Sequence, residues 1–308
     1  MVKQKYDLIV VLGPTASGKT SFAARLARQL EGEIISADSR QVYRRMDIGT
    51  GKDYGDYQVD GEQVPFHLID IVEPGMRYNV YEFQKDFLSA YNDIHRRQKM
   101  PVLCGGSGMY IESVLKGYRL IQVPPDHALR QELESKSLDE LKEILRSEAS
   151  RLHNTTDLTS KKRAVRAIEI ARYYTIHPEI DVSFPEIHPL IFGVKYDRPA
   201  QRSRITERLK ARLEEGLVEE VDSLIDEGLS PDDMEYYGLE YRYVGRYLAG
   251  MLSWDEMFGE LNTAIHQFAK RQMTWFRRME RNGFNIHWLE GHLEMDEKLR
   301  LAGKLLDQ

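Results

Sequence analysis

The chain carries Leu8-Ile9-Val10-Val11-Leu12-Gly13-Pro14-Thr15-Ala16-Ser17-Gly18-Lys19-Thr20 near its N-terminus, an apolar run followed directly by a glycine-rich loop. Residues 13–20 match G-x-x-x-x-G-K-[ST], the P-loop, whose backbone N–H groups turn inward around phosphate oxygens. The helix that follows adds a favourable dipole, Lys19 a point charge, and Thr20 a hydroxyl for Mg²⁺. We therefore predict a strand, a phosphate-binding loop formed by Gly13, Pro14, Thr15, Ala16, Ser17, Gly18, Lys19 and Thr20, and a helix.

Outward from this loop, short apolar runs alternate with amphipathic stretches. The expected strands are Leu8–Leu12, Glu33–Ser36, His67–Ile71, Pro101–Cys104 and, much later, Ile191–Tyr196; the expected helices between them are Lys19–Leu30 and Val80–Gln98. This alternation is typical of a mostly parallel sheet flanked by helices. We predict an α/β fold of the P-loop NTPase type.

Residues 120–190 differ from this pattern. They are charged, with leucines at helical spacings from Leu129 to Leu145, and Asn154–Asp157 is expected to break the chain before a helix that starts near Ser160. We predict a smaller helical insertion domain, 120–190, carried by an α/β core formed by 1–119 and 191–308. From Pro199 onward the pattern is again helical, and its longest stretches are Gln201–Glu227 and Trp254–Arg281.

The composition narrows the class of protein. Of 308 residues, 42% are hydrophobic and 30% charged, as in ordinary globular proteins. The net charge of -6 disfavours nucleic-acid binding through bulk positive charge, but it does not exclude local basic patches. The single cysteine, Cys104, excludes an intrachain disulfide and indicates a reducing compartment. Because neither a signal sequence nor a run of about 20 apolar residues is present, we expect a soluble, cytoplasmic protein.

Three further segments lie at or just beyond the ends of expected strands, whose carboxyl ends meet at one edge of a parallel sheet. Asp38 should lie near the P-loop, where its carboxylate could accept a proton or bind Mg²⁺ indirectly; capping an Asx turn is an equally good interpretation. Gly105–Gly108 is either a ligand-binding turn or only a tight turn. Asp70 has a Walker-B-like position or a capping role.

Two basic stretches, Lys161–Arg166 and Lys270–Arg278, stand out against the negative total. A run of charges is usually a solvated helix face. Two such runs beside a phosphate site nevertheless favour a polyanionic partner. The nine histidines have no metal-ligand spacing, and no GxSxG elbow for acyl transfer is present.

Together these segments resemble the tRNA dimethylallyltransferase (tRNA isopentenyltransferase) family. The matching blocks follow the family's order and are Gly13–Thr20, Ile35–Lys52, His67–Asp70, Gly105–Tyr110, Lys162–Glu169 and Gln267–Arg277. The resemblance implies transfer of a dimethylallyl group to N6 of adenosine 37 beside the tRNA anticodon. It also implies that the P-loop holds the diphosphate of dimethylallyl diphosphate rather than ATP. Without the zinc-finger extension of eukaryotic members, the sequence is expected to be of the bacterial type.

The resemblance also implies roles for single residues. Asp38 matches the family's base on the N6 amine, Thr15 a threonine near the leaving oxygen, and Arg204 an arginine that supports the diphosphate. Lys19 and Mg²⁺, held partly by Thr20, would neutralise the departing diphosphate. The tRNA-binding residues that it implies are Asp38, Ser39, Arg40, Gln41, Ser107, Lys162, Arg163, Arg166, Lys270 and Arg271. The insertion would grip the anticodon stem-loop, and a monomer is expected.

Three alternatives remain open. An ATP-dependent small-molecule kinase would explain the chain up to about residue 120, but not the insertion or the basic blocks. A prenyltransferase acting on free adenine nucleotide would keep the chemistry and change the acceptor. A non-catalytic RNA-binding protein is disfavoured by the complete P-loop.

Overall fold

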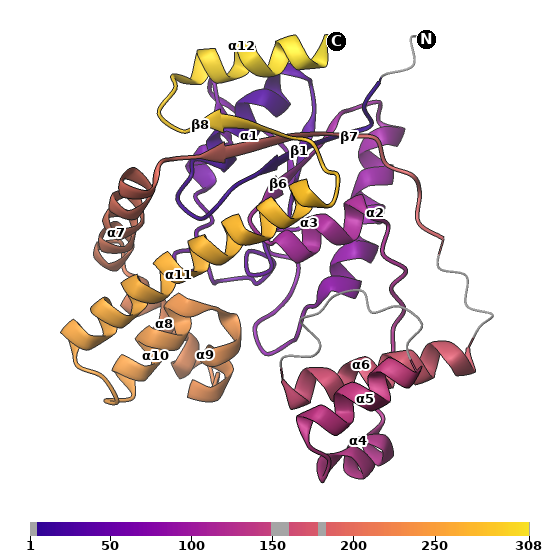
Figure 1. Ribbon diagram of the computed structural model, residues 1–308. Coiled ribbons are helices and arrows are strands. Elements are labelled where there is room, and N and C mark those ends of the chain that lie inside the picture. The colour runs from indigo at the N-terminus through magenta and orange to yellow at the C-terminus, as the bar shows by residue number, and fades with distance from the viewer. Residues whose placement is uncertain (1–4, 149–159, 178–182, 308) are drawn as a thin grey trace. The chain divides into compact units, whose positions relative to one another are not determined.

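The computed structural model describes residues 5–148, 160–177 and 183–307. The chain divides into two compact units. The larger contains the chain up to Tyr118 and from Pro185 onward, and the smaller is Arg119–Phe184. The larger unit is an α/β structure and the smaller is helical (Figure 1).

A six-stranded parallel sheet, in the order β5-β2-β6-β1-β7-β8, forms the centre of the larger unit as far as the structure describes it. The central strand β1 is in register with its two neighbours, Ile9 opposite Val102 of β6 and Leu190 of β7. Every residue of β1 is buried because helices cover both faces, which explains its unbroken apolar run. The strands are β1 (Leu8–Leu12), β2 (Glu33–Ser36), β5 (Phe66–His67), β6 (Pro101–Gly105), β7 (Pro189–Lys195) and β8 (Ile286–Glu290), with a separate hairpin of β3 (Gln58–Val59) and β4 (Glu62–Gln63).

The helices of the larger unit are α1 (Lys19–Gln29), α2 (Val80–Arg96), α3 (Gly108–Leu115), α7 (Arg198–Glu214), α8 (Leu217–Asp226), α9 (Pro231–Tyr237), α10 (Leu239–Leu248), α11 (Trp254–Arg281) and α12 (Met295–Leu306), with a 3₁₀ turn, η1 (Tyr54–Tyr57). Helices α1 and α12 cover one face of the sheet, where Phe22, Phe192 and Leu299 share a core. Helices α2, α3 and α11 lie on the other side (Figure 1). The carboxyl ends of the strands therefore stay uncovered at one edge.

Local signals in the sequence explain where several helices begin. Asn79 caps α2 and Ser253 caps α11, each in a capping box with an acidic residue three positions later. Asp197 accepts a hydrogen bond from the N–H of Ala200 at the start of α7. Such caps satisfy backbone N–H groups that have no partner within the helix.

The predicted fold class is confirmed, and three elements differ from expectation. The strand predicted at His67–Ile71 is only Phe66–His67, because Leu68 and Asp70 have φ of 63° and 55°. The helix predicted at Gln201–Glu227 is two helices, α7 and α8, because Gly216 has a φ of 105°. Strand β8 is a sixth strand that the sequence analysis does not contain.

The smaller unit contains α4 (His127–Glu134), α5 (Leu138–Glu148) and α6 (Lys161–Ile176). Helix α6 starts where it was predicted to start, and its N-cap is Ser160. Their apolar core is Leu129, Leu133, Leu141, Leu145, Ala164 and Ile168. The break predicted at Asn154–Asp157 lies outside the described residues. The domain limits of 120 and 190 remain a prediction, and the compact unit in the structure is Arg119–Phe184.

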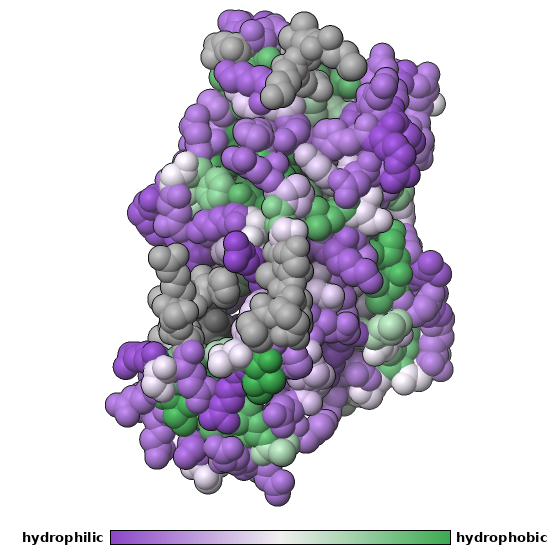
Figure 2. All heavy atoms as spheres, turned by 90° about the vertical axis from the view of Figure 1, so that its right-hand side faces the viewer, coloured by the Kyte–Doolittle hydropathy of each residue, from purple (hydrophilic) through white to green (hydrophobic). Residues whose placement is uncertain are grey.

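The face of the molecule drawn in Figure 2 is mostly polar. Charged and polar side chains cover most of the face drawn in Figure 2, and apolar residues show in scattered patches. Among the large apolar side chains that are exposed, Met76, Ile176 and Met251 belong to three separate segments of the chain. Within the described ranges, no helix combines the length and the apolar character needed to cross a membrane.

Lys52 is a buried charge that ties two loops together. Its side chain has 0% exposure, and its ammonium pairs with Asp47 at 2.8 Å and also with Asp70. It donates a further hydrogen bond to the carbonyl of Tyr43 at 2.5 Å. The loop after β2 is therefore fixed to the segment that follows β5.

Replacing Lys52 with Met should lower the free energy of unfolding by about 2 kcal/mol or more, because two carboxylates and a carbonyl lose their partner. Urea denaturation measures this. The matched control is Lys99→Met, whose ion pair with Glu31 at 3.1 Å is exposed and should contribute less than about 0.5 kcal/mol. Equal losses in both variants would contradict a special role for Lys52.

Candidate functional site

A pocket of about 850 Å³ opens at the carboxyl edge of the sheet. The loops after β1, β2 and β6 form one part of its wall, and residues of η1, α7, α9, α10, α11 and α12 form most of the rest. Crevices at this edge are where open α/β sheets bind their ligands. The segments that the sequence analysis singled out around the P-loop therefore meet in one place.

The P-loop has the tight course that its glycines predict. A Cβ on Gly13 would lie 2.5 Å from the carbonyl oxygen of Val194, so only glycine fits there. The residue before α1, Gly18, has a φ of 76°, and Ala16 has a φ of 59°. Residues with a side chain rarely adopt a positive φ, so the backbone of the loop is strained at Ala16.

Residues Thr15–Thr20 line the pocket, whereas Gly13 and Pro14 are buried outside its lining and shape the turn. Ser17 is 1% exposed, and its hydroxyl has no hydrogen-bond partner among the described residues. Buried polar groups nearly always have a partner. The unsatisfied hydroxyl inside this loop fits a site that receives an anion.

Two cations stand at the P-loop. Burial lowers the pKa of Lys19, and the nearby Arg208 lowers it further. The Arg204 guanidinium donates from Nε to the carbonyl of Ala16 at 2.9 Å and lies 4.5 Å from the centre of the Tyr196 ring. A bound anion would stabilise both charges, and it would oppose the lowering of the Lys19 pKa.

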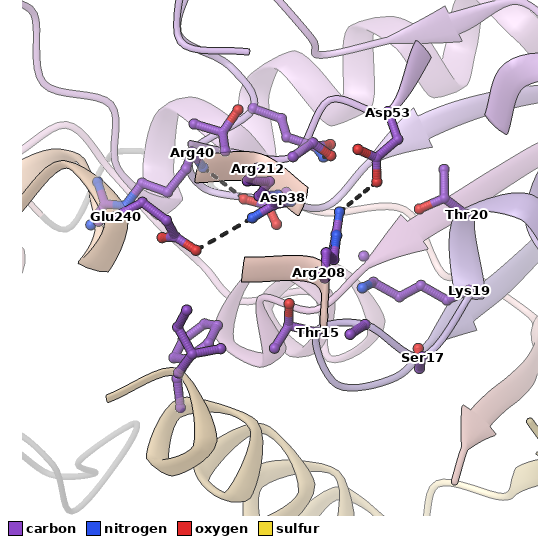
Figure 3. A pocket seen from close by; sticks show the side chains of 18 of the residues that line it. Thr15, Ser17, Lys19, Thr20, Asp38, Arg40, Asp53, Arg208, Arg212 and Glu240 are labelled. Carbon is purple, nitrogen blue, oxygen red and sulfur yellow. Dashed lines mark hydrogen bonds and ion pairs between the residues drawn. The ribbon is translucent and has the colours of Figure 1, made fainter. Parts of the chain in front are cut away.

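Asp38 lies across the pocket from the P-loop (Figure 3). Its Oδ1 accepts a hydrogen bond from the N–H of Arg40 at 2.8 Å. The Asx turn that the sequence left as an alternative is thus present, and the carboxylate lines the pocket as well. Ser39 donates its N–H to the hydroxyl of Ser107 at 3.1 Å, which joins the loops after β2 and β6.

The loop after Asp38 is fixed by side chains from two directions. Gln41 donates from Nε2 to the carbonyl of Gly51 at 2.9 Å, which folds the chain back on itself. Glu220 of α8 accepts the N–H groups of Asp47, Ile48 and Gly49 at 2.8, 2.7 and 2.9 Å. The pocket wall at Gly49–Gly51 therefore has a defined position. Sequence reasoning missed Glu220, because nothing local marks one acidic residue on a charged helix.

Arg208 and Arg212 are pocket residues that sequence reasoning also missed. Arg208 pairs with Asp53 at 2.5 Å and Arg212 with Glu240 at 3.4 Å, as the dashed lines in Figure 3 show. Burial lowers the pKa of Arg212 and raises the pKa of Glu240. A signal was available, since Arg204, Arg208 and Arg212 recur every four residues and so share one helix face.

Gln272 of α11 connects the P-loop to the loop after β6. Its Oε1 accepts the N–H of Thr15 at 2.9 Å, and its Nε2 donates to the carbonyl of Gly106 at 3.0 Å. Gln201 of α7 donates to the carbonyl of Thr15 at 2.6 Å. Two amide side chains thus hold both backbone groups of Thr15.

Other residues singled out in the sequence lie outside the pocket lining. Lys270 and Arg271 are exposed on α11, and Lys162, Arg163 and Arg166 belong to α6 of the smaller unit. Arg166 binds Glu169 at 2.9 Å and the carbonyl of Val123 at 2.7 Å. Asp70 does not take the Walker-B-like position, because it pairs with Lys52 and accepts a bond from Tyr54.

Oxygen ligands for a cation gather beside Lys19. Thr20, Asp53 and Asp56 line the pocket, and burial, followed by the charge of Asp53, raises the pKa of Asp56. In the described part of the chain, no three His, Cys, Asp or Glu residues are placed to hold a metal by themselves. Hydroxyl and carboxylate oxygens suit Mg²⁺, so the donors present fit an ion that shares its ligands with a bound phosphate compound.

The remaining wall includes Cys104, a buried free cysteine of β6. The arrangement as a whole places cations and an unsatisfied hydroxyl at one end of the pocket and the Asp38 carboxylate at the other. Such a site can bind a phosphate compound and accept a proton from a second substrate. That combination is suited to group transfer.

Comparisons with known proteins agree with this geometry. The family model described as IPP transferase matches residues 41–279, and one described as isopentenyl transferase matches residues 6–61. The chain is 58% identical over 308 residues to tRNA dimethylallyltransferase 2 of Bacteroides fragilis, with 100% of each chain covered. It is 30% identical to the tRNA isopentenylpyrophosphate transferase of Bacillus halodurans, with a TM-score of 0.70 over 98% of this chain and 96% of that one. A eukaryotic dimethylallyltransferase structure acting on tRNA has a similar fold, with a TM-score of 0.78 and 20% identity over 97% of this chain and 79% of that one.

Gln272→Leu should weaken binding of inorganic pyrophosphate about tenfold, because the variant leaves Thr15 N–H and the Gly106 carbonyl without their partner and frees the P-loop. Isothermal titration calorimetry measures the affinity. Gln267→Leu is the control, since Gln267 is exposed on the same helix. Unchanged affinity in the Gln272 variant would mean that the loop keeps its form without this bridge.

Proposed function

The chain belongs to the tRNA dimethylallyltransferase family, and from this premise we propose that it transfers the dimethylallyl group of dimethylallyl diphosphate to N6 of adenosine 37 in tRNA. Diphosphate is the leaving group. The observation that carries the proposal is that a P-loop and the Asp38 carboxylate face each other across one pocket. The reaction needs both a site for the leaving group and an acceptor for a proton.

At the donor end, the backbone of Thr15–Thr20, the Ser17 hydroxyl, Lys19 and Arg204 bind the diphosphate. Positive charge there stabilises the negative charge that develops on the leaving oxygen as the C1–O bond breaks. The Thr15 hydroxyl is proposed to lie beside that oxygen, since Gln272 and Gln201 hold the Thr15 backbone. Mg²⁺, when bound by Thr20 together with the diphosphate and beside Asp53 and Asp56, supplies further charge neutralisation.

At the acceptor end, Asp38 acts as the base. The N6 amine of adenine is a weak nucleophile because its lone pair is delocalised into the ring. As N6 attacks C1 of the dimethylallyl group, the N–H proton moves to the free oxygen of Asp38 and the electrons of the C1–O bond leave with the diphosphate. The adenine of adenosine 37 must leave its stacked position in the tRNA to reach the pocket.

The tRNA contacts are proposed at two kinds of place. Ser39, Arg40, Gln41 and Ser107 line the pocket, where the splayed-out loop bases would enter. The basic residues Lys162 and Arg163 on α6, and Lys270 and Arg271 on α11, would contact phosphates, which lets a chain of net charge -6 bind RNA. Arg166 already binds Glu169 and the carbonyl of Val123. It would therefore contribute to tRNA binding indirectly, by holding α6 in place.

We also propose that the protein acts as a monomer in the cytoplasm. The P-loop, Asp38 and Arg204, on which the proposed reaction depends, all lie in a single copy of the chain. The proposed acceptor is also a molecule of that compartment.

A transfer assay tests the proposal. Labelled dimethylallyl diphosphate and Mg²⁺ are mixed with unmodified tRNA that carries adenosine at position 37, and parallel reactions contain AMP as acceptor or ATP as donor. We expect label in the tRNA alone. Label in AMP but not in tRNA would indicate a nucleotide prenyltransferase, and ATP turnover without prenyl transfer would indicate a kinase.

Asp38→Asn separates the two roles of this side chain, since the amide oxygen can still accept the N–H of Arg40 but cannot take the proton. The single-turnover rate should fall by about 10²–10⁴-fold, with little change in affinity for dimethylallyl diphosphate. Asp60→Asn, at an exposed turn with a φ of 53°, is the control. An unchanged rate in the Asp38 variant would remove this residue from the mechanism.

Replacing Lys162 and Arg163 together with Ala should weaken tRNA binding and lower the steepness of its dependence on salt, by roughly one slope unit for each lost phosphate contact. Both residues are exposed, and Arg166 is left in place so that α6 keeps its anchor. The control removes two exposed arginines of the other unit, Arg28 and Arg96. If affinity and slope match the wild type, these residues form only a solvated face.

A further inference from the structure

Lys298 is a buried lysine that the proposed mechanism does not use. It lies on α12 and is 7% exposed. Its ammonium donates to the carbonyl of Gly291 at 2.7 Å, and it forms no ion pair with any carboxylate of the described residues. A buried charge normally has a partner of opposite charge, because burial without one is unfavourable.

The surroundings of Lys298 add to this imbalance. Lys298 lines the pocket together with the P-loop residues and Arg204. Burial lowers the pKa of Lys298 and Arg204 lowers it further, while Glu294 opposes the shift. This corner of the pocket therefore holds two cations, Arg204 and Lys298, that bind backbone carbonyls instead of carboxylates.

The two cations are held by a shared aromatic residue. The Arg204 guanidinium lies 4.5 Å from the centre of the Tyr196 ring. The same ring packs on Gly291, where a Cβ would collide with it. Since Lys298 binds the carbonyl of Gly291, Tyr196 links the position of one cation to that of the other.

We propose that Lys298 is a further anion-binding residue of the pocket, whose ammonium binds the diphosphate of the prenyl donor together with Arg204 and Lys19. The diphosphate is named on the basis of the proposed function. An ammonium has three N–H donors, and the Gly291 carbonyl occupies one of them. The remaining donors are available to phosphate oxygens.

Neither the motifs nor the family match points to this residue. Helix α12 begins at Met295, and the match to the IPP transferase model ends at residue 279. The charge comes instead from a helix that also covers one face of the sheet. A part of the chain that stabilises the fold thus also completes the donor site.

Calorimetric titration with inorganic pyrophosphate and with dimethylallyl diphosphate tests the proposal. Lys298→Gln removes the charge but keeps a donor for the Gly291 carbonyl, so a purely structural role would leave binding unchanged. We expect both affinities to fall about tenfold or more, with a shallower dependence on salt. Lys298→Arg should stay within a few-fold of the wild type. Lys304 is an exposed lysine of the same helix, and the control variant Lys304→Gln should bind both ligands with the affinity of the wild type.

Wild-type affinity in a folded Lys298→Gln variant overturns the proposal. If that variant does not fold, acetylation of the wild-type protein followed by mass spectrometry gives the answer. Pyrophosphate should slow acetylation of Lys298 about fivefold or more but leave Lys304 unaffected, and equal labelling of Lys298 with and without pyrophosphate overturns the proposal. A wild-type protein that binds neither ligand would instead contradict the proposed function itself.

Discussion

Parallel pairing of β1 with β6 on one side and β7 on the other brings the loops of these strands to one edge of the sheet. Gly13 shows how close this packing is, because the carbonyl of Val194 in β7 leaves no room for a side chain there. The P-loop can therefore turn this close to β7 only with glycine at position 13. Gln272 then fixes the loop after β1 to the loop after β6. The position of the pocket thus follows from strand order and not from the P-loop alone.

Five of the cations that line the pocket fall into two groups. Arg208 and Arg212 pair with the carboxylates of Asp53 and Glu240, and these pairs hold α7, α10 and the loop after β2 together. Lys19, Arg204 and Lys298 bind backbone carbonyls only, as far as the described residues extend. The first group is neutralised within the protein. No carboxylate of the described residues neutralises the second group, although the net charge of the chain is -6.

The sequence predicted the central part of the fold and of the site, and the reason is that these signals are local. Strand β1, the P-loop and Asp38 are each marked by neighbouring residues, and α11 has the predicted bounds. The missed features depend on contacts between distant parts of the chain. Glu220 is 171 residues from Gly49, and Gln272 is 257 residues from Thr15. No pattern within a short window of sequence can reveal such a pair. The family resemblance did not reveal α12 either, because its matching blocks end at Arg277.

The buried cysteine of β6 also has a practical consequence. Burial raises the pKa of Cys104 to about 12, although the charge of Lys19 opposes the shift. At neutral pH this side chain is therefore a thiol, whereas the thiolate is the form that reacts with oxidants and maleimides. Cys104 is the single cysteine of the chain. A cysteine introduced on the surface would then be the reactive thiol, so a fluorophore or spin label could be attached at a chosen position without first replacing the native residue.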